Sequence, residues 1–149
     1  MIKSNEVPLY KGIREFCISS LARNIAFIWG FCEATIFFVI PDVFLTFVAL
    51  FYPAYGFILC VICIFGAILG GLGMYMMGKF FPDVVLQVLQ FIPGISEQMI
   101  TFVGKDFSSH GLSAMILAPW EGIPYKIYAV QAGIINNDVV PFMLVSIPA

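Results

Sequence analysis

The stretch GFCEATIFFVIPDVFLTFVAL, residues 30–50, decides the fold of this chain, because an almost wholly apolar run carries Glu33, Pro41 and Asp42. Proline ends or kinks a helix, since it lacks an N–H and clashes with the preceding turn. A backbone break inside a membrane must face protein or a watery cavity, because lipid cannot satisfy the freed N–H and C=O groups. We therefore expect the break at Pro41 and Asp42 to face protein or a watery cavity.

The apolar pieces on either side of this break are short for a membrane crossing. Residues 24–40 would form about 25 Å of helix and residues 43–52 about 15 Å, whereas the hydrocarbon core is roughly 30 Å thick. These lengths favour a re-entrant segment that enters, turns and leaves on the same side, with one kinked crossing as the alternative. Pro53 and Gly56 then predict a turn after the second piece.

Composition indicates an integral membrane protein. Of the 149 residues, 61% are hydrophobic and 11% are charged, and the mean hydropathy is +1.00, whereas soluble domains carry about 25% charge. Residues 57–78 are uncharged and would form about 33 Å of helix, enough for one span. A net charge of -2 argues against nucleic acid as a partner.

Two parts are expected along the chain. Residues 1–23 form an interfacial N-terminal segment, and its lysines and arginines predict a cytoplasmic N-terminus. Residues 24–149 form a single membrane domain, in which the amphipathic residues 81–107 lie along the interface. The final apolar piece, residues 139–149, gives only about 16 Å of helix, so we expect the domain to lack its last span.

Small residues and aromatic residues predict packing and depth. Gly66, Gly70 and Gly73 recur on the long span, and such small residues let another helix approach closely. Tyrosines are expected in the aromatic belts at the membrane interfaces: Tyr75, Tyr125 and Tyr128.

A second break interrupts the later apolar stretch. The segment PWEGIPYK combines helix breakers with two charges: Pro119, Glu121, Gly122, Pro124 and Lys126. Two similarly placed segments interrupted by Gly or Pro indicate an inverted-repeat transporter whose site is built from discontinuous helices.

The charged residues beside the breaks are the candidate site. An acidic group at the centre of a membrane helix costs roughly 2.5–3.5 kcal/mol, so we interpret Glu33 as a proton-exchange residue, with a neutral structural glutamate as the alternative. Asp42 is either a cap of the returning half-helix or a second proton-exchange residue. Lys126 is interpreted as a head-group ligand, with snorkelling to the interface as the alternative. Glu121 is assigned to the head-group site together with Lys126, either as its salt-bridge partner or as a second proton site.

We expect no enzymatic activity, no metal and no cofactor. The single histidine, His110, excludes a multi-histidine metal cluster, and the serines show no nucleophile-elbow pattern. A membrane hydrolase that uses Glu33, Asp42 and His110 is the remaining enzymatic alternative.

Three motifs, in this order, resemble the DedA membrane proteins, also called the SNARE-associated Golgi or VTT domain family, and within it the YqaA-like members. The motifs are EATIFFVIPDVFLTFVAL, GAILGGLGMYMMGK and FSSHGLSAMILAPWEGIPYKIYAVQAG, which together cover most of residues 28–133. On this resemblance Glu33 and Asp42 match the essential acids of the family. Lys126 stands where the family often has arginines, and lysine contacts phosphate without the bidentate fork of arginine.

The resemblance implies an all-α, multi-pass protein of the bacterial inner membrane with two opposed re-entrant hairpins. Such a protein moves phospholipid or undecaprenyl phosphate between leaflets as a flippase or scramblase, in bacteria often linked to the proton motive force. We therefore expect proton-linked lipid translocation, with membrane lipids and protons as partners. The alternatives are a non-transporting assembly or scaffold protein that oligomerises through its Gly-rich span, and a small-solute or ion transporter of the same architecture.

Overall fold

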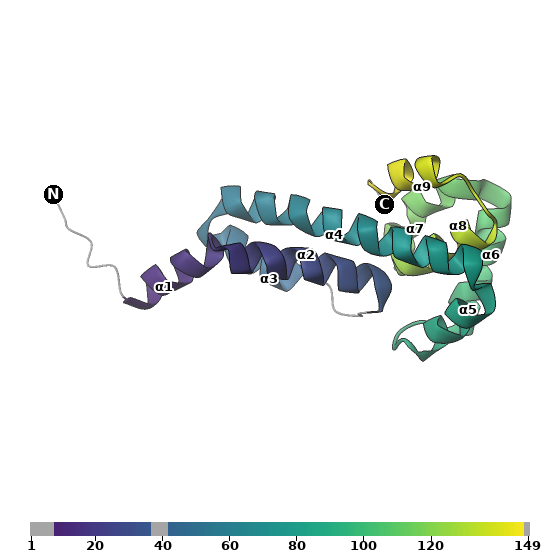
Figure 1. Ribbon diagram of the computed structural model, residues 1–149, viewed down its shortest axis with the longest axis horizontal. Coiled ribbons are helices and arrows are strands. Elements are labelled where there is room, and N and C mark those ends of the chain that lie inside the picture. Colours follow the sequence, from purple (N-terminus) through teal and green to yellow (C-terminus); the bar gives the residue numbers. More distant parts are fainter. Residues whose placement is uncertain (1–7, 37–41, 148–149) are drawn as a thin grey trace.

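Helices make up all the regular structure of the described chain (Figure 1). The structure is a computed structural model that describes residues 8–36 and 42–147, with the backbone alone for residues 8–11 and 117–120. The elements are α1 Pro8–Cys17, α2 Ser20–Thr35, α3 Asp42–Phe51, α4 Pro53–Phe80, α5 Pro82–Phe91, α6 Glu97–His110, the 3-10 turn η1 Gly111–Ser113, α7 Ala114–Glu121, α8 Tyr125–Ile134 and α9 Val139–Ser146. The expected all-α fold is confirmed for these residues, whereas Pro41 lies outside them.

Helix α4 is the long central element of the fold (Figure 1). It is contacted by α2 and α3 from the N-terminal part of the chain and by α5, α8 and α9 from the C-terminal part. It has 28 residues, and its most apolar stretch has a mean hydropathy of 2.6. Among the described residues it is the one helix long and apolar enough to cross a membrane, and only 33% of that stretch is buried within the chain. Because most of its surface is left open, α4 differs from the core helix of a soluble domain and indicates membrane association.

The turn predicted after residues 43–52 is confirmed at Tyr52, directly before Pro53, whereas Gly56 takes no part in it. The chain breaks at Tyr52, and Pro53 is the first residue of α4, a position where its missing N–H costs nothing. Gly56 continues the helix, since a Cβ there would clash with Ala49 of α3. The glycine therefore serves close packing between α3 and α4 and does not form a turn.

Helices α2 and α3 pack on the first part of α4, and α1 contacts α2 and α3 (Figure 1). We call these three helices, α1 to α3, the N-terminal layer. A Cβ at Gly30 of α2 would clash with the carbonyl oxygen of Cys63, and one at Gly66 of α4 would clash with that of Phe27. Gly70 likewise lies against Phe31 and Ala34. The two helices thus touch backbone to backbone, whereas Gly73 lies beyond this contact and faces open space, in contrast to its expected packing role.

Helices α5 to α9, which we call the C-terminal bundle, gather around the last part of α4 (Figure 1). Residues 126–133 of α8 are all buried, because α4, α5, α6 and α7 each contact this helix. Glycine again permits the approach: a Cβ at Gly78 would clash with the carbonyl of Val130, and one at Gly133 with that of Tyr75. Helix α9 adds Phe142, which stacks on Tyr75 with ring centroids 5.0 Å apart.

Two expected belt tyrosines belong to this core. Tyr75 and Tyr128 are 1% and 0% exposed. A buried tyrosine hydroxyl requires a hydrogen-bond partner, and these donate to the carbonyl oxygen of Asn137 and to the carboxylate of Glu121. The aromatic rings therefore fill the bundle and do not mark an interface.

The second break lies slightly later than the proline pattern suggests. Pro119 falls inside α7, which ends only at Glu121. Gly122 follows with a φ of 69°, a left-handed conformation that glycine adopts without steric cost. Pro124 then precedes the first residue of α8, so Gly122 and Pro124 form the break and Pro119 does not.

Candidate functional site

A hollow of about 160 Å³ lies where α2, α4, α8 and α9 meet. Its polar lining comes from three described residues, Glu33, Tyr125 and Ser146. The rest of the lining is apolar: Ile64, Ala67, Ile68 and Ile147. The hollow therefore combines one carboxyl group and two hydroxyl groups with hydrocarbon walls.

Helix α2 carries Glu33 to this hollow. Gly30 lies three residues earlier, and its lack of a side chain brings α2 against α4, whose residues 64–68 contribute the opposite wall. Glu33 is half-buried, and both Lys126 and Asp42 are close enough to act on it electrostatically. Asp42 is exposed at the first turn of α3, where the helix dipole favours a negative charge.

Lys126 lies inside the protein and does not snorkel. It is 2% exposed, because α8 begins at Tyr125, within the C-terminal bundle. A buried ammonium group is strongly unfavourable unless opposite charge and hydrogen bonds compensate it. Glu33 provides part of that compensation. The structure thus brings Glu33, Asp42 and Lys126 together from three different helices.

Tyr125 and Ser146 are site residues that the sequence analysis did not identify as such. The ring of Tyr125 lies against Gly71 of α4, where a Cβ would clash with it. Its hydroxyl donates to Ser146 Oγ at 2.8 Å, and the Ser146 hydroxyl donates to the carbonyl oxygen of Phe142 at 2.8 Å. A signal existed for Ser146, since it is the one polar side chain in the apolar piece of residues 139–149.

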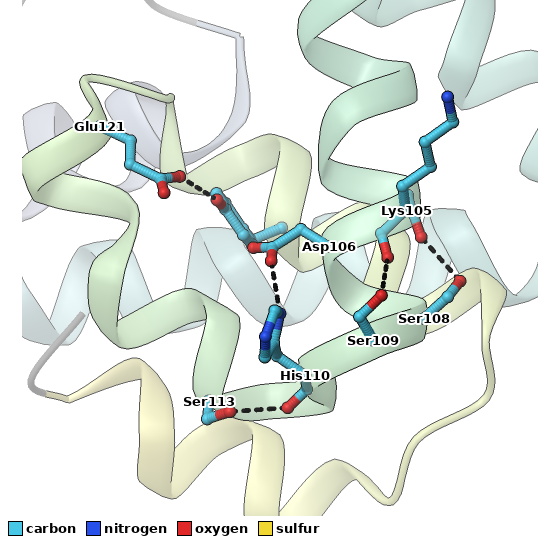
Figure 2. A network of polar contacts seen from close by, with 9 residues as sticks. Lys105, Asp106, Ser108, Ser109, His110, Ser113 and Glu121 are labelled. Atoms are coloured by element: carbon cyan, nitrogen blue, oxygen red, sulfur yellow. Dashed lines mark hydrogen bonds and ion pairs between the residues drawn. The ribbon is translucent and has the colours of Figure 1, made fainter.

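Glu121 belongs to a separate polar cluster (Figure 2). Its carboxylate accepts a hydrogen bond of 3.2 Å from the hydroxyl of Tyr128. Nearby on α6, Asp106 contacts His110 Nδ1 at 2.8 Å, and Asp106 also acts electrostatically on Tyr128. The structure therefore pairs Glu121 with Tyr128, whereas Lys126 interacts with Glu33.

The described residues contain no group of three or more His, Cys, Asp or Glu side chains that could hold a metal ion. Comparison of the chain with protein-family models, with curated proteins and with solved structures found no match.

Proposed function

We propose that the chain is a membrane transporter of the DedA type that moves a lipid or lipid phosphate between leaflets in exchange with protons. The observation that carries this proposal is a half-buried acid, Glu33, that lines a hollow within electrostatic range of the buried cation Lys126. Ionisable residues inside membrane proteins are rare and mark substrate or proton pathways.

The lengths of the broken helices support two re-entrant hairpins. Helix α3 is about 15 Å long, α7 about 12 Å and α8 about 15 Å, all short of the roughly 30 Å that a crossing needs. Helix α8 can lie at membrane depth despite its broken start, because surrounding helices shield it. On this view the α2–α3 pair and the α7–α8 pair are the two opposed hairpins, with α2 and α3 against the first part of α4 and α8 against its last part.

Proton exchange at Glu33 would change the electrostatic balance of the site. With both acids ionised, Glu33, Asp42 and Lys126 carry two negative charges and one positive charge. Protonation of Glu33 leaves Asp42 and Lys126 to neutralise each other. A change of this kind between two hairpins biases the population of conformations open to either side, and Lys126 would then favour an anionic head group when Glu33 is neutral.

The scaffold alternative receives less support. Gly66 and Gly70 are already used within the chain, where they meet α2. Gly73 alone of the predicted packing glycines faces open space, and a single glycine does not make a helix-pairing stripe. Of the two alternatives, a small-solute or ion transporter receives more support than a scaffold, because the hollow is small.

Reconstitution into proteoliposomes with a fluorescent lipid tests the proposal. Glu33→Gln and Lys126→Ala should each slow lipid movement at least about tenfold, the effect of losing roughly 1.4 kcal/mol from the rate-limiting step. Matched controls are Glu15→Gln and Lys105→Ala, which alter exposed charges outside the hollow. Lipid flux equal to that of the parent in Glu33→Gln, which is nearly isosteric, would refute the assigned role.

A further inference from the structure

The direction of the hydrogen bonds in the hollow restricts what the hollow can bind. Ser146 has one hydroxyl hydrogen, and it donates that hydrogen to the carbonyl oxygen of Phe142. Ser146 Oγ must then accept from Tyr125, whose own hydrogen is used in this bond. A hydroxyl group whose hydrogen is used retains only acceptor lone pairs. Tyr125 therefore offers the hollow an acceptor.

Glu33 has the same character when it is ionised, because a carboxylate accepts hydrogen bonds and cannot donate them. The described polar groups that line the hollow thus form a set of acceptors, whereas Lys126 is buried and is not among the lining residues. When both acids are ionised, Glu33 and Asp42 together with Lys126 carry a net charge of about -1, which favours a cationic ligand. A ligand that matches this arrangement is a cation with N–H donors.

The size and walls of the hollow narrow the class further. Its volume of about 160 Å³ is close to that of an engineered cavity of about 150 Å³ that holds benzene. It accommodates a short amine with one or two methylene groups but not a whole lipid. The isoleucine walls suit the methylene groups, while the acceptors occupy the polar side.

We infer that the hollow binds a primary ammonium group on a short alkyl arm, held between the Glu33 carboxylate and the Tyr125 hydroxyl oxygen. This inference rests on the proposed function and narrows its substrate to a head group that carries an ammonium group. The same chemistry is present in a free alkylamine and in the ethanolamine head group of a lipid. A bare lipid phosphate lacks it.

Ligand-observed NMR on the full chain in detergent tests this site with three small probes. Ethylammonium carries both charge and N–H donors, tetramethylammonium carries charge without donors, and ethanol carries a donor without charge. We expect saturable binding of ethylammonium alone. Comparable binding of tetramethylammonium would overturn the requirement for donors, and failure of ethylammonium to bind would overturn the site.

Three variants locate the binding. Glu33→Gln should weaken ethylammonium binding about tenfold to a hundredfold, since it removes a charged acceptor, and Tyr125→Phe about twofold to tenfold. Ser146→Ala should also weaken binding, because it frees the Tyr125 hydrogen to point into the hollow. Tyr55→Phe, on α4 outside the lining residues, is the matched control. If Glu33→Gln and Tyr125→Phe both bind ethylammonium as tightly as the parent, the inference is overturned. Because two variants are used, poor folding of one of them does not remove the test.

Competition experiments in nanodiscs distinguish a free alkylamine from a lipid head group as the source of the ammonium group. Displacement of ethylammonium by phosphatidylethanolamine, but not by phosphatidylcholine, identifies a lipid head group, whereas displacement by neither identifies a free amine. Lipid flux without ethylammonium binding would reject this inference and leave the proposed function intact. Ethylammonium binding without lipid flux would reject the proposed function and leave the site intact.

Discussion

The N-terminal layer and the C-terminal bundle contact the same helix, α4, but they bury different kinds of residue. The core of the layer is small and apolar, with Ala22, Ala26 and Val48 among its fully buried members. The core of the bundle contains large rings, Tyr75, Tyr128 and Phe142. In addition, the buried polar or charged side chains of the described chain, Lys126, Gln131 and Ser146, all belong to the bundle.

This difference shows how each region solves the problem of polar groups in an apolar setting. A buried polar group is stable only when partners satisfy it. The bundle encloses α8 on several sides and can hold a lysine, whereas α2 of the layer buries a single stripe of small residues, Ala22, Ala26, Gly30 and Ala34. The layer contributes the acids Glu33 and Asp42, and the bundle contributes Lys126. The charged site therefore forms only where the two regions meet.

The largest expected change in the free energy of unfolding comes from removing an aromatic ring from the core of the bundle. Phe142→Ala removes a fully buried ring stacked on Tyr75 and should lower the free energy of unfolding by about 2–4 kcal/mol. The effect should fall toward the low end, because the unfolded state in detergent also keeps the ring out of water. Val48→Ala in the layer should cost about 1–2 kcal/mol. Unfolding titrations with a denaturing detergent compare the two, and equal losses would contradict the distinction between the cores.

A smaller effect is expected from glycine contacts. Gly133→Ala places a methyl group against the carbonyl oxygen of Tyr75 and should destabilise the bundle by about 1–3 kcal/mol. Gly73→Ala is the matched control, because its Cβ would meet open space. The control should be neutral or should stabilise α4 by up to about 1 kcal/mol. Thermal unfolding in detergent measures both, and a Gly133→Ala protein as stable as its parent would show that α4 and α8 do not touch through this glycine.

The smallest expected losses of stability come from removing helix caps, and they should be equal in the layer and in the bundle. Ser19 caps α2 by accepting from the Ala22 N–H, and Ser96 caps α6 by accepting from the Met99 N–H, each at 3.2 Å. Replacement of either serine by alanine should cost about 1 kcal/mol, because a cap satisfies a local donor wherever its helix lies. A difference of more than about 1 kcal/mol between the two variants would mean that one cap also supports tertiary packing.

Local sequence predicted most of the helices but fewer of their contacts. The apolar piece of residues 43–52 became α3, the uncharged residues 57–78 lie within α4, and the amphipathic residues 81–107 became α5 and most of α6. These elements follow from hydrophobic periodicity and from local proline and glycine effects. The turn predicted at Pro53 and Gly56 occurs at Tyr52 and does not include Gly56, because a glycine has the same local signal whether it bends the chain or admits a neighbouring helix.

The site residues show the same limit. Glu33, Asp42 and Lys126 were noticed because a charge in an apolar run stands out in any sequence. Tyr125 and Ser146 did not stand out as site residues, since a tyrosine beside a break and a serine in an apolar helix are common. Their hydrogen bond joins positions 21 residues apart, and no local pattern predicts which helices will meet.

The apolar, helical character of the chain and the charges beside its two breaks follow from the amino-acid sequence, because composition and periodicity act over a few turns of helix. The packing of the helices sets which side chains meet: Glu33 shares a hollow with Tyr125 and Ser146, Lys126 is buried near Glu33, and Glu121 pairs with Tyr128. The physical reason is that backbone-to-backbone contacts at glycines set how closely and at which turn the helices meet, and this depends on both helices together.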